Sequence, residues 1–246
     1  MAKEEPEVLP EGIIKKKEFD PESWTPKTEL GKKVKSKEIK SIDEVFDSEK
    51  KILEAEIVDM LVPNLESGLA SVGQSKGKFG GGKKSVWKQT QKKTQEGNKP
   101  KFATLAVIGN KDGFIGIGYG KSKETMPARE KALRNAKLNL IRIKRGCGSW
   151  LCNCKSPHSI PFKVTGKFSA VRIYLLPAPK GTGLCIENEC KKVLEFAGIK
   201  DIYSKSTSSK TKLNLVKACF DALKRLSQIK IQDSFIKNSG TITGKK

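Results

Sequence analysis

The spacing of hydrophobic positions divides the chain into segments with different periods. Residues 102–108 (FATLAVI) are apolar almost without interruption, which predicts a buried strand. The turn-forming residues 110–113 (NKDG) follow, and residues 114–118 (FIGIG) predict the return strand of a hairpin. Residues 124–140 then place Ala132, Leu133, Ala136 and Leu140 on one face of a predicted helix.

The rest of the chain contains shorter periodic segments. Residues 53–62 have the i, i+4, i+7, i+8 pattern of a short amphipathic helix. Further on, residues 162–164 and 171–176 predict strands, and residues 191–197 predict a helix capped by Gly198. Residues 211–227 form the clearest helical pattern, and the apolar stripe on it is predicted to lie in the core: Val216, Cys219, Phe220, Leu223 and Leu226.

These segments predict an α+β protein with four parts: an extended arm (1–52), a first domain (53–145), a second domain (146–228) and a tail (229–246). Helix, strands, hairpin and basic helix follow one another in the first domain as in a double-stranded-RNA-binding fold. Within it, residues 71–85 are rich in Gly and Lys and predict a flexible basic loop. This loop is either a plain linker or a segment ordered on a partner.

Charge is distributed unevenly over the 246 residues. The chain carries 49 Lys and Arg against 27 Asp and Glu, a net charge of +22, yet residues 1–60 contain 12 basic and 16 acidic residues. The remainder is therefore strongly cationic, which destabilises a folded state unless a polyanion neutralises it. Nucleic acid is the first candidate. An anionic membrane would require the cations on one amphipathic helix, and they are not gathered that way.

Secretion and membrane insertion do not fit the pattern. No window approaches about 18 uninterrupted apolar residues, so no membrane span is expected. The first residues lack the layout of a signal peptide, which predicts that the chain stays in the compartment where it is made. The six cysteines are then expected to be reduced or metal-bound rather than paired in disulfides.

A short cysteine-rich segment carries the most specific chemical signal. Cys147, Cys152, Cys154 and His158, the only histidine of the chain, fall within 12 residues and make up a common tetrahedral zinc set. The alternative is three loop cysteines beside a histidine that faces solvent or RNA. No glutamate that could activate water lies in the segment, so a Zn²⁺ ion here would be structural.

Catalytic motifs are incomplete. Residues 116–122 (GIGYGKS) fail the phosphate-loop pattern at Ile115 and the dinucleotide pattern at Lys121. Their glycines are therefore expected to mark a twisted strand that another backbone of the protein, or an RNA backbone, approaches closely. His158 has no carboxylate nearby in the sequence to orient it. Cys185, Cys190 and Cys219 are interpreted as small hydrophobic residues. An enzyme is therefore not predicted.

Six stretches of the chain resemble the universal small-subunit ribosomal protein five family in its archaeal and eukaryotic branch. They are WTPKTELGKKVK (24–35), FATLAVIGNKDGFIGIGYGKSKE (102–124), AREKALRNAKLNLIRIKRGCGSW (128–150), PHSIPFKVTGK (157–167), VRIYLLPAPKGTGL (171–184) and AGIKDIYSKS (197–206). The resemblance implies a double-stranded-RNA-binding-like domain followed by a left-handed βαβ domain.

The resemblance also implies a function. A member of this family would be a structural constituent of the small ribosomal subunit, bind ribosomal RNA, and contact ribosomal proteins four and eight. It would help form the path along which messenger RNA enters and support decoding accuracy. A cytoplasmic ribosome is then the expected location, with nucleolar assembly in a eukaryote.

The candidate RNA-binding residues combine the basic stretches with the family blocks. They are Lys88, Lys92, Lys93, Lys99, Lys101, Arg134, Arg142, Lys144, Arg145, Lys163, Lys167 and Lys180. Residues 96–102 read EGNKPKF where the family has the pattern AGRRxRF, so a cation is lost and an acid gained beside Lys99. The alternative function is that of a free regulator that binds double-stranded RNA outside ribosomes.

Overall fold

The computed structural model describes residues 24–48, 50–75, 77, 84–209 and 211–244. Part of the predicted arm (1–23), residues 76 and 78–83 of the Gly/Lys-rich loop and the last two residues lie outside the described residues. No described helix is long and apolar enough to cross a bilayer.

The first unit is built on a five-stranded antiparallel sheet with the order β1-β3-β4-β5. Strand β3 (Gly97–Gly109) is long enough to pair with two strands along one edge: β1 (Glu66–Ala70) along its second half and β2 (Lys88–Thr94) along its first half. The remaining elements are α3 (Ala55–Leu61), β4 (Phe114–Ser122), α4 (Thr125–Leu138) and β5 (Leu140–Arg142). The predicted helices and hairpin are confirmed.

The second unit has a four-stranded sheet with the order β7-β8-β10-β9. Its β9 (Leu184–Cys185) and β10 (Ile202–Thr207) are parallel and are joined through α5 (Asn188–Ala197), so the predicted βαβ element is present. The other elements are β7 (Val164–Phe168), β8 (Val171–Pro177) and α6 (Lys212–Gln228). The α+β prediction, with a double-stranded-RNA-binding-like unit followed by this domain, is confirmed.

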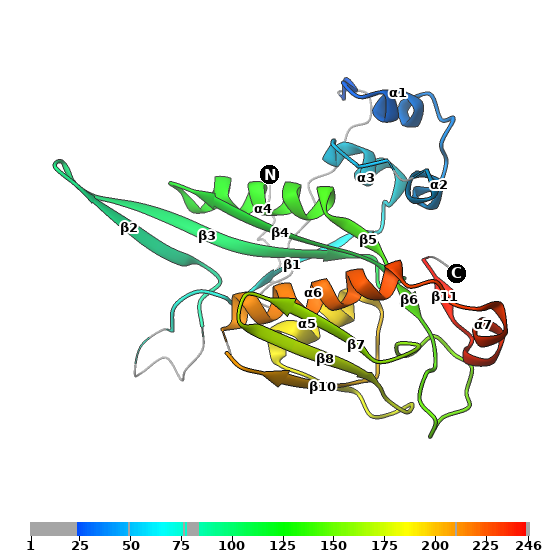
Figure 1. The fold of residues 1–246 in the computed structure, drawn as a ribbon. Coiled ribbons are helices and arrows are strands. Elements are labelled where there is room, and N and C mark those ends of the chain that lie inside the picture. The colour runs from blue at the N-terminus through cyan, green and yellow to red at the C-terminus, as the bar shows by residue number, and fades with distance from the viewer. Residues whose placement is uncertain (1–23, 49, 76, 78–83, 210, 245–246) are drawn as a thin grey trace, which may run out of the picture.

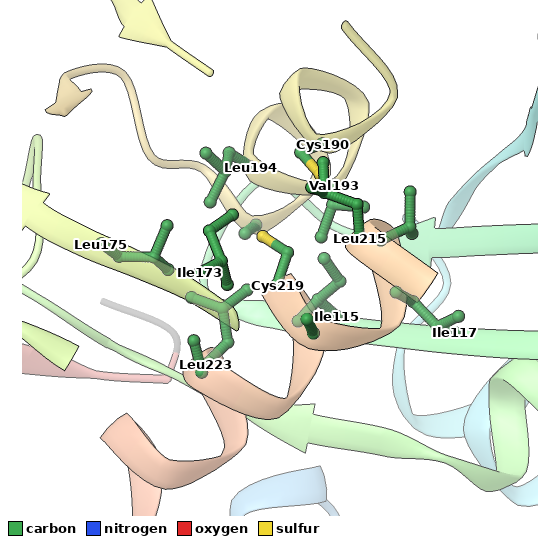
Figure 2. Close-up of a cluster of buried hydrophobic side chains, with 14 of the residues drawn as sticks. Ile115, Ile117, Ile173, Leu175, Cys190, Val193, Leu194, Leu215, Cys219 and Leu223 are labelled. Carbon is green, nitrogen blue, oxygen red and sulfur yellow. The ribbon is translucent and has the colours of Figure 1, made fainter. Parts of the chain in front are cut away.

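The two units stack in layers (Figure 1). Helix α4 covers one face of the five-stranded sheet, whereas α5 and α6 lie between its other face and the second sheet. Figure 2 shows this central layer, where Ile115 and Ile117 of the first unit meet Leu215 and Cys219 of α6. The predicted stripe of α6 is buried there, except Phe220, which is half-buried.

Glycines in β4 let α4 approach the sheet closely, as their pattern predicts. A Cβ atom on Gly118 would lie 2.1 Å from the carbonyl oxygen of Ala132, and one on Gly116 would lie 2.2 Å from that of Ala136. These distances are far shorter than a non-bonded contact, so no larger residue fits without moving the helix. The same arrangement recurs in the second unit, between Gly166 of β7 and Ala218 of α6.

The described part of the predicted arm is not fully extended. It contains two short helices, α1 (Glu29–Lys35) and α2 (Ile42–Asp47), capped by the hydroxyls of Thr28 and Ser41. Its apolar residues, among them Trp24 and Val45, are buried against the first unit rather than left for another surface. The sequence did not show this because the anchors are scattered and each helix is only two turns or less.

The C-terminal residues also contain regular structure. Residues after 229 form α7 (Asp233–Ser239) and β11 (Ile242–Thr243), and β11 pairs with β6 (Lys144–Arg145). The predicted tail therefore returns to the junction between the two units. The domain boundaries themselves remain predictions.

Candidate RNA interface and Cys3His cluster

The β2–β3 hairpin is the most exposed regular element of the first unit. It projects beyond the helices that cover the rest of the sheet (Figure 1). Its tip turns at Gly97, whose φ of +111° is one that side-chain-bearing residues rarely adopt. Because no core covers this part of the sheet, its backbone ladder holds the side chains in register.

Register places most of the predicted lysines on one face of the hairpin. Lys92 lies opposite Lys99, and Thr90 lies opposite Lys101. Since side chains alternate between faces along a strand, Lys88, Lys92, Lys99 and Lys101 share one face and Lys93 lies on the other. All five are exposed.

Few acids offset this positive charge. Among the described residues, only Lys99 of the five forms an ion pair, at 2.6 Å between its Nζ and Glu96 Oε2. Glu96 is the acid that the family pattern lacks. Like charges directly opposite one another on a sheet are destabilising, so the facing Lys92 and Lys99 favour an anionic ligand.

Several predicted RNA-binding residues occupy other places. Arg134 is exposed on α4, Lys163 and Lys167 are exposed around β7, and Lys180 is exposed on the loop before β9. Lys163 Nζ lies 5.3 Å from the centre of the Tyr174 ring. These residues do not share the hairpin face.

Three cations at the end of the first unit have partners within the chain. Arg142 contacts Asp43 Oδ1 at 3.1 Å and Asp47 Oδ1 at 2.9 Å; burial disfavours its charged form, but these hydrogen bonds outweigh that effect and raise its pKa. Arg145 is buried and donates to the carbonyl oxygens of Lys111 and Gly198. Lys144 donates a hydrogen bond to the carbonyl oxygen of Ile229. Its partial burial, and then the positive charge of the nearby Arg142, lower the pKa of the Lys144 ammonium. The contacts described for these three cations are therefore with other residues of the protein.

The predicted metal ligands come together. The Sγ atoms of Cys147, Cys152 and Cys154 and the nearest ring nitrogen of His158 all lie within 4.8 Å of one another. Cys147 follows β6 and is tied by its amide to Ser239 at the end of α7, while Gly146 and Ser159 form a β-bridge that closes the loop. These contacts bring both ends of the segment to one place.

The thiols have different environments. Burial, followed by hydrogen bonds from the neighbouring thiols, raises the pKa of Cys147 to about 11. Hydrogen bonds from Ser156 lower the pKa of the exposed Cys154 to about 6. Three sulfurs and one imidazole nitrogen at this spacing fit the donor set of a tetrahedral Zn²⁺ site, in which a bound metal would hold the thiols as thiolates.

His158 has a partner that the sequence did not suggest. Its Nδ1 lies 2.8 Å from Oδ2 of Asp201, and both side chains are about 95% buried. The expectation that no carboxylate orients this ring was therefore wrong, because the aspartate is 43 residues away along the chain. With Nδ1 engaged, Nε2 faces the cysteines, 4.0 Å from Cys152 Sγ.

The other cysteines lie apart from this cluster. Cys190 and Cys219 are fully buried in the central layer, as expected for small hydrophobic residues (Figure 2). Hydrogen bonding to Cys219, followed by burial, raises the pKa of Cys190. Cys185 is exposed on β9, so it is not packed as the small hydrophobic residue that the sequence suggested.

Comparison with known proteins gives a consistent result for both units. Residues 85–144 match the family model "Ribosomal protein S5, N-terminal domain", and residues 166–235 match "Ribosomal protein S5, C-terminal domain".

Similar whole proteins carry the name "Small ribosomal subunit protein uS5". One from Nanoarchaeum equitans is 49% identical over 224 residues, which cover 91% of this chain and 96% of that protein. One from Methanobrevibacter smithii is 43% identical, with 90% and 98% covered, and one from Methanocaldococcus jannaschii is 40% identical, with 92% and 98% covered. On these matches, which cover both units and the described part of the arm, the chain belongs to the ribosomal protein S5 family.

Proposed function

We propose that this protein is a structural constituent of the small ribosomal subunit and that the β2–β3 hairpin is its main contact with ribosomal RNA. The lysine face of the hairpin carries the proposal: four exposed lysines (Lys88, Lys92, Lys99 and Lys101) lie on one face of a hydrogen-bonded strand pair that projects from the molecule (Figure 1). Such a surface neutralises phosphates without reading bases, and so positions the protein on RNA by shape and charge.

The finer parts of the family function belong to the same proposal. The protein would contact ribosomal proteins four and eight, line the path along which messenger RNA enters and support decoding accuracy. The exposed basic residues outside the hairpin, Arg134, Lys163, Lys167 and Lys180, would make secondary contacts with ribosomal RNA. Arg142, Lys144 and Arg145 would act mainly by fixing the arm and the junction between the units.

Sedimentation of cell lysate after a high-salt wash tests this function. We expect the chain to co-migrate with small subunits at near-stoichiometric amounts. Recovery only in a slowly sedimenting pool would contradict the proposal and favour a free regulator that binds double-stranded RNA. Cross-linking of the washed particles then tests the predicted neighbours and messenger RNA.

We also propose that the Cys3His cluster binds one structural Zn²⁺ ion. Cys147, Cys152 and Cys154 would supply thiolates, and His158 would supply Nε2. Such an ion would cross-link the loop between β6 and β7, whose described backbone hydrogen bonds are few.

Metal analysis of the purified full-length chain tests the zinc site. About one zinc per chain is expected, with loss of the metal in Cys152→Ser and retention in Cys185→Ser, an exposed cysteine outside the cluster. A folded, metal-free protein recovered from zinc-replete cells would contradict the site.

A further inference from the structure

We propose that Asp201 is a positioning residue that couples the Cys3His cluster to the surface loop formed by residues 179–183. The inference rests on the proposed zinc site and adds a role to it: metal binding would set the shape of a basic loop on the opposite side of Asp201.

Asp201 uses both of its carboxylate oxygens, one on each side. Oδ2 lies 2.8 Å from Nδ1 of His158. Oδ1 accepts hydrogen bonds from the amides of Gly181 at 3.0 Å and Gly183 at 2.8 Å. A single buried carboxylate therefore connects a predicted metal ligand to two backbone groups of the loop.

The backbone reinforces this link. The carbonyl oxygen of His158 accepts hydrogen bonds from the amides of Lys200 at 2.8 Å and Asp201 at 3.1 Å. His158 and Asp201 are thus tied by main chain as well as side chain, so movement of the imidazole is transmitted to the carboxylate.

The loop has a shape that depends on an external acceptor. Gly181 and Gly183 both have positive φ angles, +91° and +74°, which turn their amides inward toward the carboxylate. Among the described contacts, the amide and hydroxyl of Thr182 donate to the carbonyl oxygen of Pro179, and the carbonyl oxygen of Gly183 accepts a hydrogen bond from the amide of Ile202. Without Asp201, the two glycine amides would lose their acceptor in this conformation.

Metal binding and this carboxylate favour the same form of the imidazole. A histidine that ligates through Nε2 must be neutral and carry its proton on Nδ1, and a carboxylate on Nδ1 stabilises that tautomer. With a metal ion at Nε2, the Nδ1 proton would be a stronger donor to Asp201 Oδ2, and the carboxylate would be held more firmly against the loop. Because coupling between two sites is reciprocal, an ordered loop also strengthens metal binding.

The coupled loop belongs to a charged groove. The groove has a volume of about 730 Å³, and the loop contributes Lys180 to a lining that also includes His158, Lys200 and Asp201. Lys180 is one of the proposed RNA contacts. Zinc bound at the cluster would therefore fix the position of a cation that lies outside the cluster.

Amide hydrogen exchange of the full-length protein, followed by NMR with and without zinc, tests the coupling. We expect the amides of Gly181 and Gly183 to exchange at least about tenfold more slowly in the zinc-loaded protein, while amides of the β2–β3 ladder keep the same rate. Asp201→Asn should abolish this difference and weaken zinc binding by about 10–100-fold. Glu195→Gln, in the wall of the same groove, should change neither.

A second variant covers the case in which Asp201→Asn does not fold. Gly183→Ala strains the loop through its positive φ, and an added Cβ meets no other atom within 4 Å. If the coupling exists, this change at the loop lowers zinc affinity although it touches no ligand.

The outcomes separate the two proposals. Zinc bound with equal exchange at Gly181 and Gly183 in both states would overturn the coupling and leave the zinc site standing. Faster exchange throughout the zinc-free protein, the β2–β3 ladder included, would also overturn it, since the effect would then be general loosening. If no zinc binds at all, the zinc site itself fails.

Discussion

The described arm and the β2–β3 hairpin both carry many charged side chains, but the arm pairs them with other residues of the protein, whereas the hairpin leaves most of them exposed to another molecule. The arm and α3 bring acids to cations of the same chain: Asp43 and Asp47 contact Arg142, and Asp59 contacts Lys137. The hairpin presents lysines that, apart from Lys99, have no acidic partner among the described residues. The hairpin therefore carries positive charge that no acid among the described residues offsets, and another molecule can neutralise it.

A buried carboxylate shows how fully the arm pairs its charges within the protein. Glu54 is buried and accepts hydrogen bonds from Trp24 Nε1 at 3.1 Å and from the amides of Lys27 at 2.9 Å and Thr28 at 2.6 Å. Burial opposes the charged form of Glu54, but these hydrogen bonds outweigh it and lower its pKa. One carboxylate thus anchors the start of the described arm, whereas nothing comparable holds the hairpin.

The largest expected effect comes from neutralising the hairpin face. We expect the change of Lys88, Lys92, Lys99 and Lys101 to Gln to lower affinity for an RNA duplex about 100-fold at low salt, or about 2.7 kcal/mol, equally for unrelated sequences. The matched control makes the same change in charge on the arm, at Lys32, Lys33, Lys37 and Lys40, and should have little effect. Filter binding measures both. Loss of affinity for one sequence alone would contradict a contact made to phosphates.

Glu54→Gln should produce the next largest effect, on stability rather than RNA binding. Loss of a charged acceptor for three donors is expected to lower the free energy of unfolding by about 2 kcal/mol. Because the folded pKa of Glu54 lies below its ordinary value of 4.5, its contribution is complete above that pH and is lost as the pH falls through the folded pKa.

Denaturant unfolding at several pH values checks this prediction. The difference between the wild type and Glu54→Gln should shrink on acidification, whereas Glu56→Gln, in the first turn of the helix that Glu54 precedes, should be nearly neutral at every pH. A difference that grows toward acid pH would contradict the prediction that the pKa of Glu54 is lowered in the folded protein.

Arg142→Gln should have a smaller effect and sharpen the contrast between the regions. Both of its ion pairs are partly exposed, so we expect a loss of about 1 kcal/mol in unfolding free energy. RNA affinity should change less than twofold, because its guanidinium is held by Asp43 and Asp47. An RNA defect as large as that of a hairpin lysine would instead favour the role predicted from the sequence.

Glu96→Gln should produce the smallest effect. Removing this carboxylate frees Lys99 from an exposed ion pair, so RNA affinity is expected to rise by about twofold or less without a change in stability. Titration at low salt measures the gain. Weaker binding would mean that Glu96 holds Lys99 in the conformation that contacts RNA.

Local patterns in the sequence account for much of the fold. The uninterrupted apolar run of β3, the Asn110–Gly113 turn and the stripe of α6 each depend on neighbours a few residues apart. The glycines of β4 indicated the close approach of a second backbone because the nucleotide motifs fail there, but only the structure shows that this backbone is α4 rather than RNA. The four cluster ligands were found because they lie within one short segment.

Other features depend on partners distant in the sequence. Asp201 is 43 residues from His158, and Glu54 is 30 residues from Trp24, so neither role has a local signal. Arg142 and Arg145 look like surface cations in a basic stretch, and only tertiary structure shows their acidic and carbonyl partners. The strand β11 forms by pairing with β6, about 100 residues earlier.

The salt dependence of RNA binding tests the central claim most directly. Each lysine that neutralises a phosphate contributes about 0.7–0.9 to the slope of the logarithm of affinity against the logarithm of salt concentration. The account predicts that the wild-type slope falls by about 3 in the protein with the four hairpin lysines changed to Gln, and stays the same in the matched arm variant. Equal slopes for the wild type and the hairpin variant would contradict it.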